Sequence, residues 1–373
     1  MDGPLELYVH IPFCARKCNY CDFYSFPADE KTRETFFRAL EEEIESSPWT
    51  GSSASSIFIG GGTPSIVKPE QIGRVMEKLT EHFHVLPDAE ITLEANPGTV
   101  TLESLAAYRT MGVNRLSMGL QSSNGKTLQK LGRIHDFGTF VSSYRLAREA
   151  GFENISVDLM SGLPGETLQD FENSLFQTIS LNPEHISVYS LIIEENTPFF
   201  SLYAEESGTA REELPGEDLD MKMTASAVRI LSEAGYERYE ISNYARPGFE
   251  SRHNTGYWTG VPYLGFGPAA ASFVDGKRFK NALSVNWCGL PYIETETLSE
   301  EDRMSEFMIL GLRMVRGVRD EDFRKRFNRS MFEVFGEIID RYVRLGVLSR
   351  AGGNVYLTPY GLDVSNMVLS EFV

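Results

Sequence analysis

Hydrophobic and polar positions follow two different periods along the first two-thirds of the chain. Short apolar runs with a period of two indicate strands, and longer segments with an apolar residue every three or four positions indicate helices. Strands alternating with helices predict parallel βαβ units, hence an α/β barrel or a doubly wound sheet. Strands are expected at Leu5–Ile11, Ser56–Gly60, Glu90–Ala95, Arg115–Gln121, Ile155–Met160, His185–Ile192 and Arg238–Ser242, and helices near Lys31–Ser46, Pro69–His82, Thr101–Met111, Asp136–Ala150, Leu168–Ser180 and Gly216–Ala234.

Several expected strands carry polar or small residues on one face only. Since the helices should cover the apolar faces, the polar faces should turn toward a common interior. This predicts a barrel with a polar cavity, not one filled by Val, Ile and Leu. An antiparallel sheet with one solvated face is the alternative, and the intervening helices speak against it. The residues concerned are Thr92, Glu94, Ser117, Gly119, Gln121, Ser156, Asp158, Ser187 and Tyr189.

The alternation stops near Arg246, which suggests three parts. Residues 1–245 are expected to form the α/β domain. Residues 246–298 are expected to be connecting loops, because Arg246–Gly267 is rich in Gly, Tyr, Asn and Pro. Residues 299–373 are expected to form a small, mainly helical domain that resembles a winged helix, with helices at Ser299–Gly317, Arg319–Phe327 and Met331–Leu345 and a strand at Tyr356–Thr358.

The charge balance argues against some classes of binding partner. The 373 residues include 35 basic and 53 acidic ones, a net charge of −18. Such a chain is repelled by phosphate backbones, so no nucleic-acid partner is expected. No apolar run reaches the roughly 18 residues of a membrane helix, and the N-terminus lacks the basic start and apolar core of a signal peptide. The expected location is therefore the cytoplasm.

Three of the four cysteines lie close together directly after the first expected strand. Cys14, Cys18 and Cys21 form a C-x3-C-x2-C motif, and Cys288 is far away. A cluster of this kind indicates metal or iron–sulfur ligation in a reducing compartment. Three thiolates leave one iron of a four-iron cluster open to a small molecule's amine and carboxylate. Zinc held by the three cysteines with His10 or a distant ligand is the alternative.

The cysteine spacing, with the aromatic Tyr20 before the last cysteine, resembles the radical SAM superfamily, named for S-adenosylmethionine (SAM). Further motifs agree in order: Gly60-Gly61-Gly62-Thr63-Pro64, Glu94-Ala95-Asn96-Pro97, Gly119-Leu120-Gln121-Ser122, Leu131-Gly132-Arg133-Ile134-His135, and the run from Asp158 to Gly165. The series is similar to the subfamily of oxygen-independent coproporphyrinogen III oxidases and HemW-type haem chaperones, over essentially the whole chain. The resemblance implies a partial (β/α)6-type barrel with a smaller C-terminal domain.

The resemblance also implies the site. Cys14, Cys18 and Cys21 would hold a [4Fe-4S] cluster with SAM at its open iron. The reaction of the superfamily is cleavage of SAM by the reduced cluster to methionine and a 5′-deoxyadenosyl radical. Each polar side chain could instead be a buried group satisfied by the backbone. The implied SAM residues are Tyr8 beside the cluster, Tyr20 at the adenine, Gly61, Gly62 and Thr63 in the loop at the methionine moiety, Glu94 as a further SAM contact, Gln121 and Asp158 near the ribose, and Arg133 at the carboxylate.

Two features separate the branches of this subfamily. Phe23 stands where the oxidases have a fourth cysteine, and His253-Asn254-Thr255-Gly256-Tyr257-Trp258 resembles a segment of the HemW branch. The resemblance therefore implies a chaperone that binds haem and passes it to acceptor proteins, with membrane-associated ones among the candidates, and an electron-donor protein as a further partner. His253 is the expected haem ligand; a structural His253, or ligation by Cys288, His82 or His84, stays open.

Coproporphyrinogen III oxidase activity is the second hypothesis, although Phe23 speaks against it. A radical SAM enzyme for another substrate, such as one that degrades haem, is the third. The acidic balance argues against RNA as that substrate. Neither productive cleavage of SAM nor an oligomeric state is implied.

Overall fold

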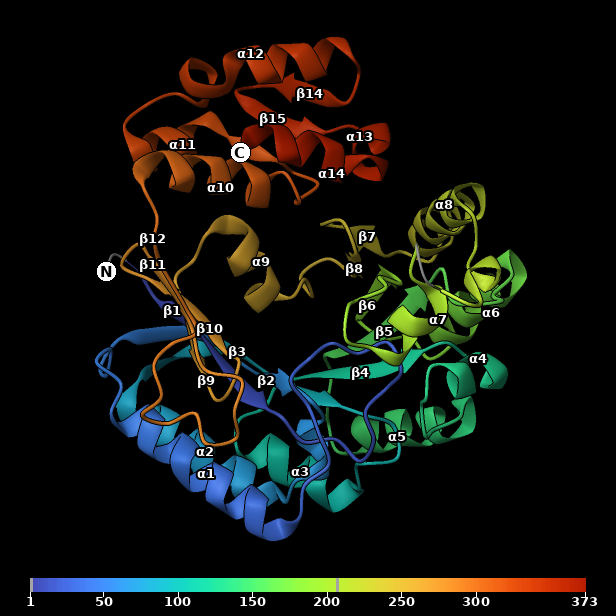
Figure 1. Ribbon diagram of the computed structural model, residues 1–373, viewed down its shortest axis with the longest axis vertical. Coiled ribbons are helices and arrows are strands. Elements are labelled where there is room, and N and C mark those ends of the chain that lie inside the picture. The colour runs from blue at the N-terminus through green and yellow to red at the C-terminus, as the bar shows by residue number, and fades with distance from the viewer. Residues whose placement is uncertain (1–2, 206–207) are drawn as a thin grey trace.

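The computed structural model describes residues 3–205 and 208–373, and its centre is one large sheet (Figure 1). Its order is β12-β11-β10-β9-β1-β2-β3-β4-β5-β6-β8-β7. The stretch from β1 to β6 is parallel throughout. The α/β prediction is therefore confirmed. These strands are β1 (Leu5–Ile11), β2 (Ser53–Gly61), β3 (His84–Ala95), β4 (Arg115–Gln121), β5 (Ile155–Ser161) and β6 (His185–Ser190).

Helices connect these strands and cover the outer face of the sheet (Figure 1). The apolar face of β1 packs there against α1, where Phe36 and Phe37 are fully buried. Side-chain caps begin several helices, as Asp29 does by accepting a hydrogen bond from Thr32 N at 2.8 Å. The helices are α1 (Glu30–Glu45), α2 (Pro69–His82), α3 (Leu102–Thr110), α4 (Gly125–Lys130), α5 (Phe137–Glu149), α6 (Leu168–Ile179), α7 (Pro198–Tyr203) and α8 (Glu217–Glu233).

The inner face of the parallel strands is polar, as the period-two pattern predicts. Ser117 on β4 donates a hydrogen bond to Asp158 on β5 at 3.1 Å. Ser156 and His185 pair at 2.8 Å between Oγ and Nδ1. Hydrogen bonds between these buried groups offset part of the cost of keeping a polar interior.

The expected strand at Arg238–Ser242 is wrong. The chain instead forms the short β7 (Glu237–Arg238) and β8 (Asn243–Ala245), and β8 pairs antiparallel with β6. Arg238 Nε donates to Ile241 O at 3.1 Å and Glu240 accepts from Ser242 N at 2.8 Å. These local bonds close a turn where a continuous strand was expected, so the parallel sheet ends at β6.

Residues 246–298 are not connecting loops, which corrects the expected domain organisation. They contain α9 (Arg252–Thr259) and the strands β9 (Tyr263–Phe266), β10 (Ala271–Val274), β11 (Lys277–Lys280) and β12 (Glu294–Thr297). β9 pairs parallel with β1, and the next three strands continue antiparallel. The physical reason is the free edge of β1, which needs a partner for its backbone groups.

The C-terminal domain has its own hydrophobic core, with Met308, Phe323 and Ile339 fully buried. The order helix, strand, helix, helix and hairpin agrees with the expected winged-helix-like arrangement. No helix in the described part of the chain is long and apolar enough to span a membrane. Its elements are α10 (Glu300–Gly311), β13 (Val318–Arg319), α11 (Asp320–Phe327), α12 (Met331–Arg344), β14 (Leu348–Ala351), β15 (Asn354–Leu357), α13 (Pro359–Asp363) and α14 (Ser365–Leu369).

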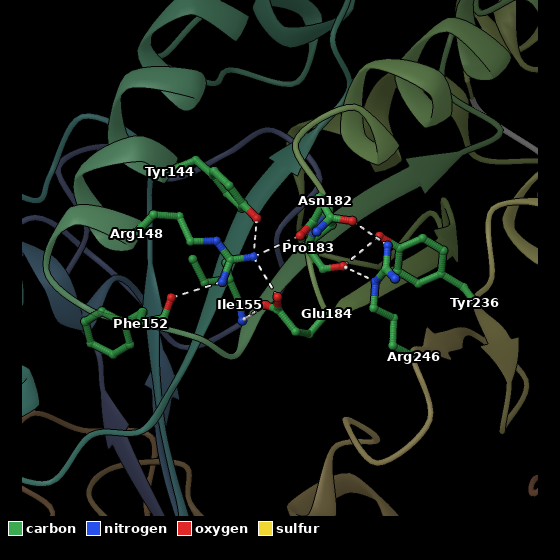
Figure 2. A network of polar contacts seen from close by, with 9 residues as sticks. All are labelled: Tyr144, Arg148, Phe152, Ile155, Asn182, Pro183, Glu184, Tyr236 and Arg246. Carbon is green, nitrogen blue, oxygen red and sulfur yellow. Dashed lines mark hydrogen bonds and ion pairs between the residues drawn. The ribbon is translucent and has the colours of Figure 1, made fainter.

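A polar network ties α5 to the starts of β5 and β6 (Figure 2). The Arg148 guanidinium donates to Glu184 at 2.8 Å, to Asn182 O at 2.9 Å and to Phe152 O at 3.0 Å. Glu184 also accepts from Ile155 N at 2.9 Å. Arg246 extends the network by donating to Asn182 and Pro183 O. The end of the barrel away from the cysteine loop is held by these bonds.

Arg148→Met is expected to lower the free energy of unfolding by about 2–3 kcal/mol, because it leaves the mostly buried Glu184 without its cation. Urea unfolding of cluster-free protein measures this. Arg350→Met is the matched control, since its ion pair with Asp340 is solvent-exposed and worth less than about 0.5 kcal/mol. Equal losses in the two variants would contradict a stabilising role for the network.

Candidate functional site

The cysteine loop follows β1 and is held by backbone hydrogen bonds. Cys14 N donates to Phe26 O at 3.1 Å, and Asn19 N donates to Leu131 O at 3.0 Å. Cys14, Cys18 and Cys21 are each half-buried and free. The loop is therefore shaped by its main chain and leaves all three thiols available as ligands.

Three side chains link two of these cysteines in a continuous chain of contacts. Cys14 Sγ lies 3.5 Å from Thr63 Oγ1, which accepts from Asn96 Nδ2 at 2.7 Å. Asn96 Oδ1 accepts from Arg133 Nη2 at 2.8 Å, and Arg133 Nη1 lies 3.7 Å from Cys18 Sγ. Arg133 is also fixed by Gly119 O at 2.5 Å. The predicted residues Thr63 and Arg133 are thus brought to the cysteines, with Asn96 between them.

A narrow cavity opens beside this chain of contacts. Cys18, Thr63, Asn96 and Arg133 line it. A guanidinium cation facing a cavity next to a thiol is suited to an anionic group of a ligand bound there. The Arg133 cation is therefore suited to the carboxylate of an amino-acid moiety.

The glycine run after β2 is required by close packing. A side chain on Gly61, whose φ is +106°, would overlap the His10 ring. A Cβ on Gly62 would lie 2.7 Å from Phe13 O. Gly61 N also donates to Glu94 Oε2 at 3.0 Å. These residues bring the end of β2 against the root of the cysteine loop, where larger residues could not fit.

Two carboxyl groups and one cation face the barrel interior. Desolvation and then the negative charge of Asp158 raise the pKa of Glu94 to about 7. Burial also raises the pKa of Asp158, which the cation of Arg115 and hydrogen bonds from serines oppose. Arg115 is buried, and its Nε has no hydrogen-bond partner among the described residues. These groups are typical of a site for a polar ligand.

Gln121 ends β4 in a strained conformation. Its φ is +68°, which is unusual for a residue with a side chain, and the pairing of β4 with β5 slips between Gly119 and Gln121. A Cβ on Gly119 would lie 2.8 Å from Gln121 Nε2. The bulge therefore turns the Gln121 amide back over Gly119, toward Arg133.

Tyr8 and His10 lie side by side at the end of β1. Tyr8 Oη is 2.9 Å from His10 Nδ1, and His10 Nε2 is 2.8 Å from Tyr24 O. Both His10 nitrogens are engaged. Over residues 3–205 and 208–373, no three His, Cys, Asp or Glu side chains converge on a single metal ion. His10 would have to leave both partners to join the cysteines as a zinc ligand.

Tyr20 lies in the cysteine loop and packs against α7. The ring centroids of Tyr20 and Phe199 are 6.4 Å apart. Phe199 N in turn donates to Asn19 O at 3.0 Å. The aromatic face predicted for the adenine is therefore fixed from behind by a helix.

His253 lies on α9 and not in the expected loop. It is 1% exposed, with Nδ1 2.8 Å from Ser56 Oγ and Nε2 3.1 Å from Tyr257 Oη. Burial lowers its pKa to about 3. A side chain on Gly256 would overlap the Glu6 carboxyl, so α9 sits tightly on the sheet. This geometry does not favour the predicted haem ligation, because the ring would have to leave both partners.

The alternative ligands lie elsewhere. Cys288 is exposed and its thiol donates to Ala39 O at 3.1 Å. His82 ends α2 and His84 begins β3, far along the chain from α9. None of these three belongs to the cavity beside Cys18.

Comparison with known proteins agrees with this geometry. The Radical SAM superfamily model matches residues 8–177 and the HemN C-terminal domain model matches residues 298–364. The solved structure of Escherichia coli coproporphyrinogen III oxidase, HemN, described as a radical SAM enzyme, superposes with a TM-score of 0.86 at 25% identity, covering 99% of this chain and 90% of that one. The chain is therefore a radical SAM protein with a HemN-type C-terminal domain.

Comparison with sequence relatives identifies the branch of the superfamily to which the chain belongs. The chain is 37% identical to the Bacillus subtilis heme chaperone HemW, over 98% of both chains. It is 32% identical to the Escherichia coli heme chaperone HemW, over 99% of this chain and 98% of that one. The chain belongs to the HemW family.

Membership of the radical SAM superfamily implies a [4Fe-4S] cluster and SAM, and the residues present fit both. Three free thiols lie on one loop. The cavity beside Cys18 presents the Arg133 cation. The bound cofactors supply one-electron chemistry. The protein's part is to place the thiols and to fix Arg133 through Asn96 and Gly119.

Proposed function

We propose that this protein binds haem and passes it to acceptor proteins, and that it carries a [4Fe-4S] cluster with SAM at the open iron. The observation that carries the proposal is similarity to heme chaperones over the full chain, including both domains. Phe23 adds to it, because its side chain is 57% exposed at the place of the fourth cysteine in the oxidases that the motifs resemble.

Within this proposal Cys14, Cys18 and Cys21 ligate the cluster. Arg133 holds the SAM carboxylate, and the strained Gln121 and buried Asp158 face its ribose. Glu94, Gly61, Gly62 and Thr63 line the methionine end, while Tyr8 borders the cluster and Tyr20 the adenine. The contacts that support these roles are those of Arg133 with Cys18 and of Gly61 with Glu94.

The proposed haem-transfer function is tested in the absence of oxygen. The cluster is reconstituted, the protein is titrated with haem, and a second sample is assayed with coproporphyrinogen III, SAM and a reductant. Stoichiometric haem binding without turnover is the expected result. The similarity to HemN favours coproporphyrinogen III oxidase as the second candidate. Formation of protoporphyrinogen IX would establish that activity and overturn the chaperone proposal.

Asn96→Ala is expected to weaken SAM binding about tenfold, because Asn96 positions Arg133 and is itself held by Thr63. Equilibrium binding of SAM to the reconstituted protein measures this, and cluster content should not change. Asn173→Ala is the matched control, since the Asn173 side chain is exposed on the helix and, among the described residues, accepts a hydrogen bond only from Gln169. Unchanged SAM affinity in Asn96→Ala would remove Asn96 from the site.

A further inference from the structure

A second cavity lies between the barrel and the C-terminal domain. It has a volume of about 250 Å³ and lies where α9, the strands β9 to β11, α10 and α11 meet. Figure 1 shows α9 lying between the sheet and the C-terminal helices. Its apolar wall consists of Tyr257, Trp258, Tyr263, Phe273, Phe307 and Leu310.

The side chains that line this cavity carry a net positive charge, although the protein as a whole is strongly acidic. Arg278, Arg303 and Arg326 line it with a single carboxylate, Glu306, which gives a local net charge of +2. Arg278 forms ion pairs with Glu306 at 2.6 Å and with Glu296 at 3.3 Å. The other two guanidinium groups in the wall, those of Arg303 and Arg326, are therefore not paired with Glu306, although the whole chain has a net charge of −18.

Arg303 and Arg326 have no carboxylate within ion-pair distance in the described parts of the chain. The buried Nε of Arg303 has no hydrogen-bond partner there. Arg326 donates one hydrogen bond to Gly260 O at 3.2 Å and lies 5.6 Å from the Phe307 ring centroid. Desolvation and the nearby charge of Arg303 lower the pKa of Arg326. Arg303 is half-buried and Arg326 is exposed at the rim, so both guanidinium groups are available to a ligand with anionic groups in the apolar space.

We propose that this cavity is the haem seat, with the macrocycle against the aromatic wall and the two propionates on Arg303 and Arg326. The proposal rests on the proposed haem function and locates it. A flat macrocycle suits aromatic faces, and a guanidinium pairs with a carboxylate through two hydrogen bonds. The wall also presents Tyr257 and Tyr263, whose phenols belong to a residue type that ligates haem iron.

The cavity is distinct from the cluster site but adjoins its surroundings. Tyr257 and Tyr263 also line a separate cavity of about 360 Å³ that reaches Tyr8 and Phe23. The centroids of the two tyrosine rings are 4.7 Å apart. This tyrosine pair is therefore a shared wall between the haem seat and the region beside the cysteine loop.

The experiment compares wild type with the Arg303→Gln/Arg326→Gln double variant, both as reconstituted full-length protein. Each is titrated with ferric haem and with its propionate dimethyl ester, followed by Soret absorbance. Wild type is expected to prefer haem over the ester at least tenfold. The double variant should lose tenfold or more in haem affinity, and its preference for the free acid should vanish. Arg344→Gln is the control, because Arg344 is exposed on α12 and away from the cavity.

Cluster content and thermal midpoint show whether the double variant is folded. If it is not, Arg303→Gln alone serves as the test, since the Arg303 guanidinium makes no hydrogen bond within the described residues. A folded variant that binds haem and ester as wild type does would overturn this seat while leaving the proposed function intact. A wild type that binds no haem at all would overturn the proposed function itself.

Discussion

Cys18→Ser is expected to abolish the iron–sulfur absorbance of the reconstituted protein. Two thiolates and a hydroxyl cannot replace three thiolates as cluster ligands. The fold should survive, because the loop is anchored by main-chain bonds such as that from Asn19 N to Leu131 O at 3.0 Å. The thermal midpoint of the cluster-free variant should therefore equal that of the cluster-free wild type.

Cys288→Ser is the matched control for this prediction. Cys288 is exposed, and its thiol contacts only Ala39 O among the hydrogen bonds of the described residues. Iron and sulfide content should stay at the wild-type value in this variant. Retention of the cluster in Cys18→Ser, or its loss in Cys288→Ser, would show that the ligands are assigned incorrectly.

The parallel half of the sheet could be predicted from the sequence because its signals are local. Leu5–Ile11 and Arg115–Gln121 are strands with the expected bounds, since period-two patterns and flanking turn residues define them. The four-residue strands β9 to β12 could not be predicted in this way. Tyr263-Leu264-Gly265-Phe266 contains a glycine and becomes a strand only by pairing with β1, more than two hundred residues earlier.

The parts of the site that lie in sequence motifs could be predicted. The parts that depend on contacts between distant residues could not. The cysteine spacing points to ligands without any structure. The position of Asn96 between Thr63 and Arg133 depends on three separate strand ends and loops, although Asn96 lies in one of the quoted motifs. For His253 the sequence shows the residue type but not its burial. That Arg303 and Arg326 lack carboxylate partners likewise follows only from the packing of two domains.

Glu6→Gln is expected to stabilise the protein increasingly as pH rises. Glu6 is 3% exposed on β1, and burial followed by the negative charge of Glu90 raises its pKa to about 9. Its Oε2 has no hydrogen-bond partner among the described residues. Because the pKa in the folded chain exceeds that in the unfolded chain, the folded chain holds a proton that the unfolded chain releases above the ordinary glutamate value of 4.5. Stability from this group is therefore lost as pH rises from 4.5 toward 9.

Glutamine keeps the shape of Glu6 and cannot ionise, so the variant escapes this loss. Between pH 5.5 and 8.5 the difference in free energy of unfolding, variant minus wild type, should grow by up to about 4 kcal/mol. Urea unfolding of both cluster-free proteins across this range measures it. Glu153→Gln is the control, since Glu153 is exposed and its difference should stay flat. A flat difference for Glu6→Gln would mean that Glu6 is already ionised in the folded protein, and that the close packing of α9 on β1 tolerates its charge.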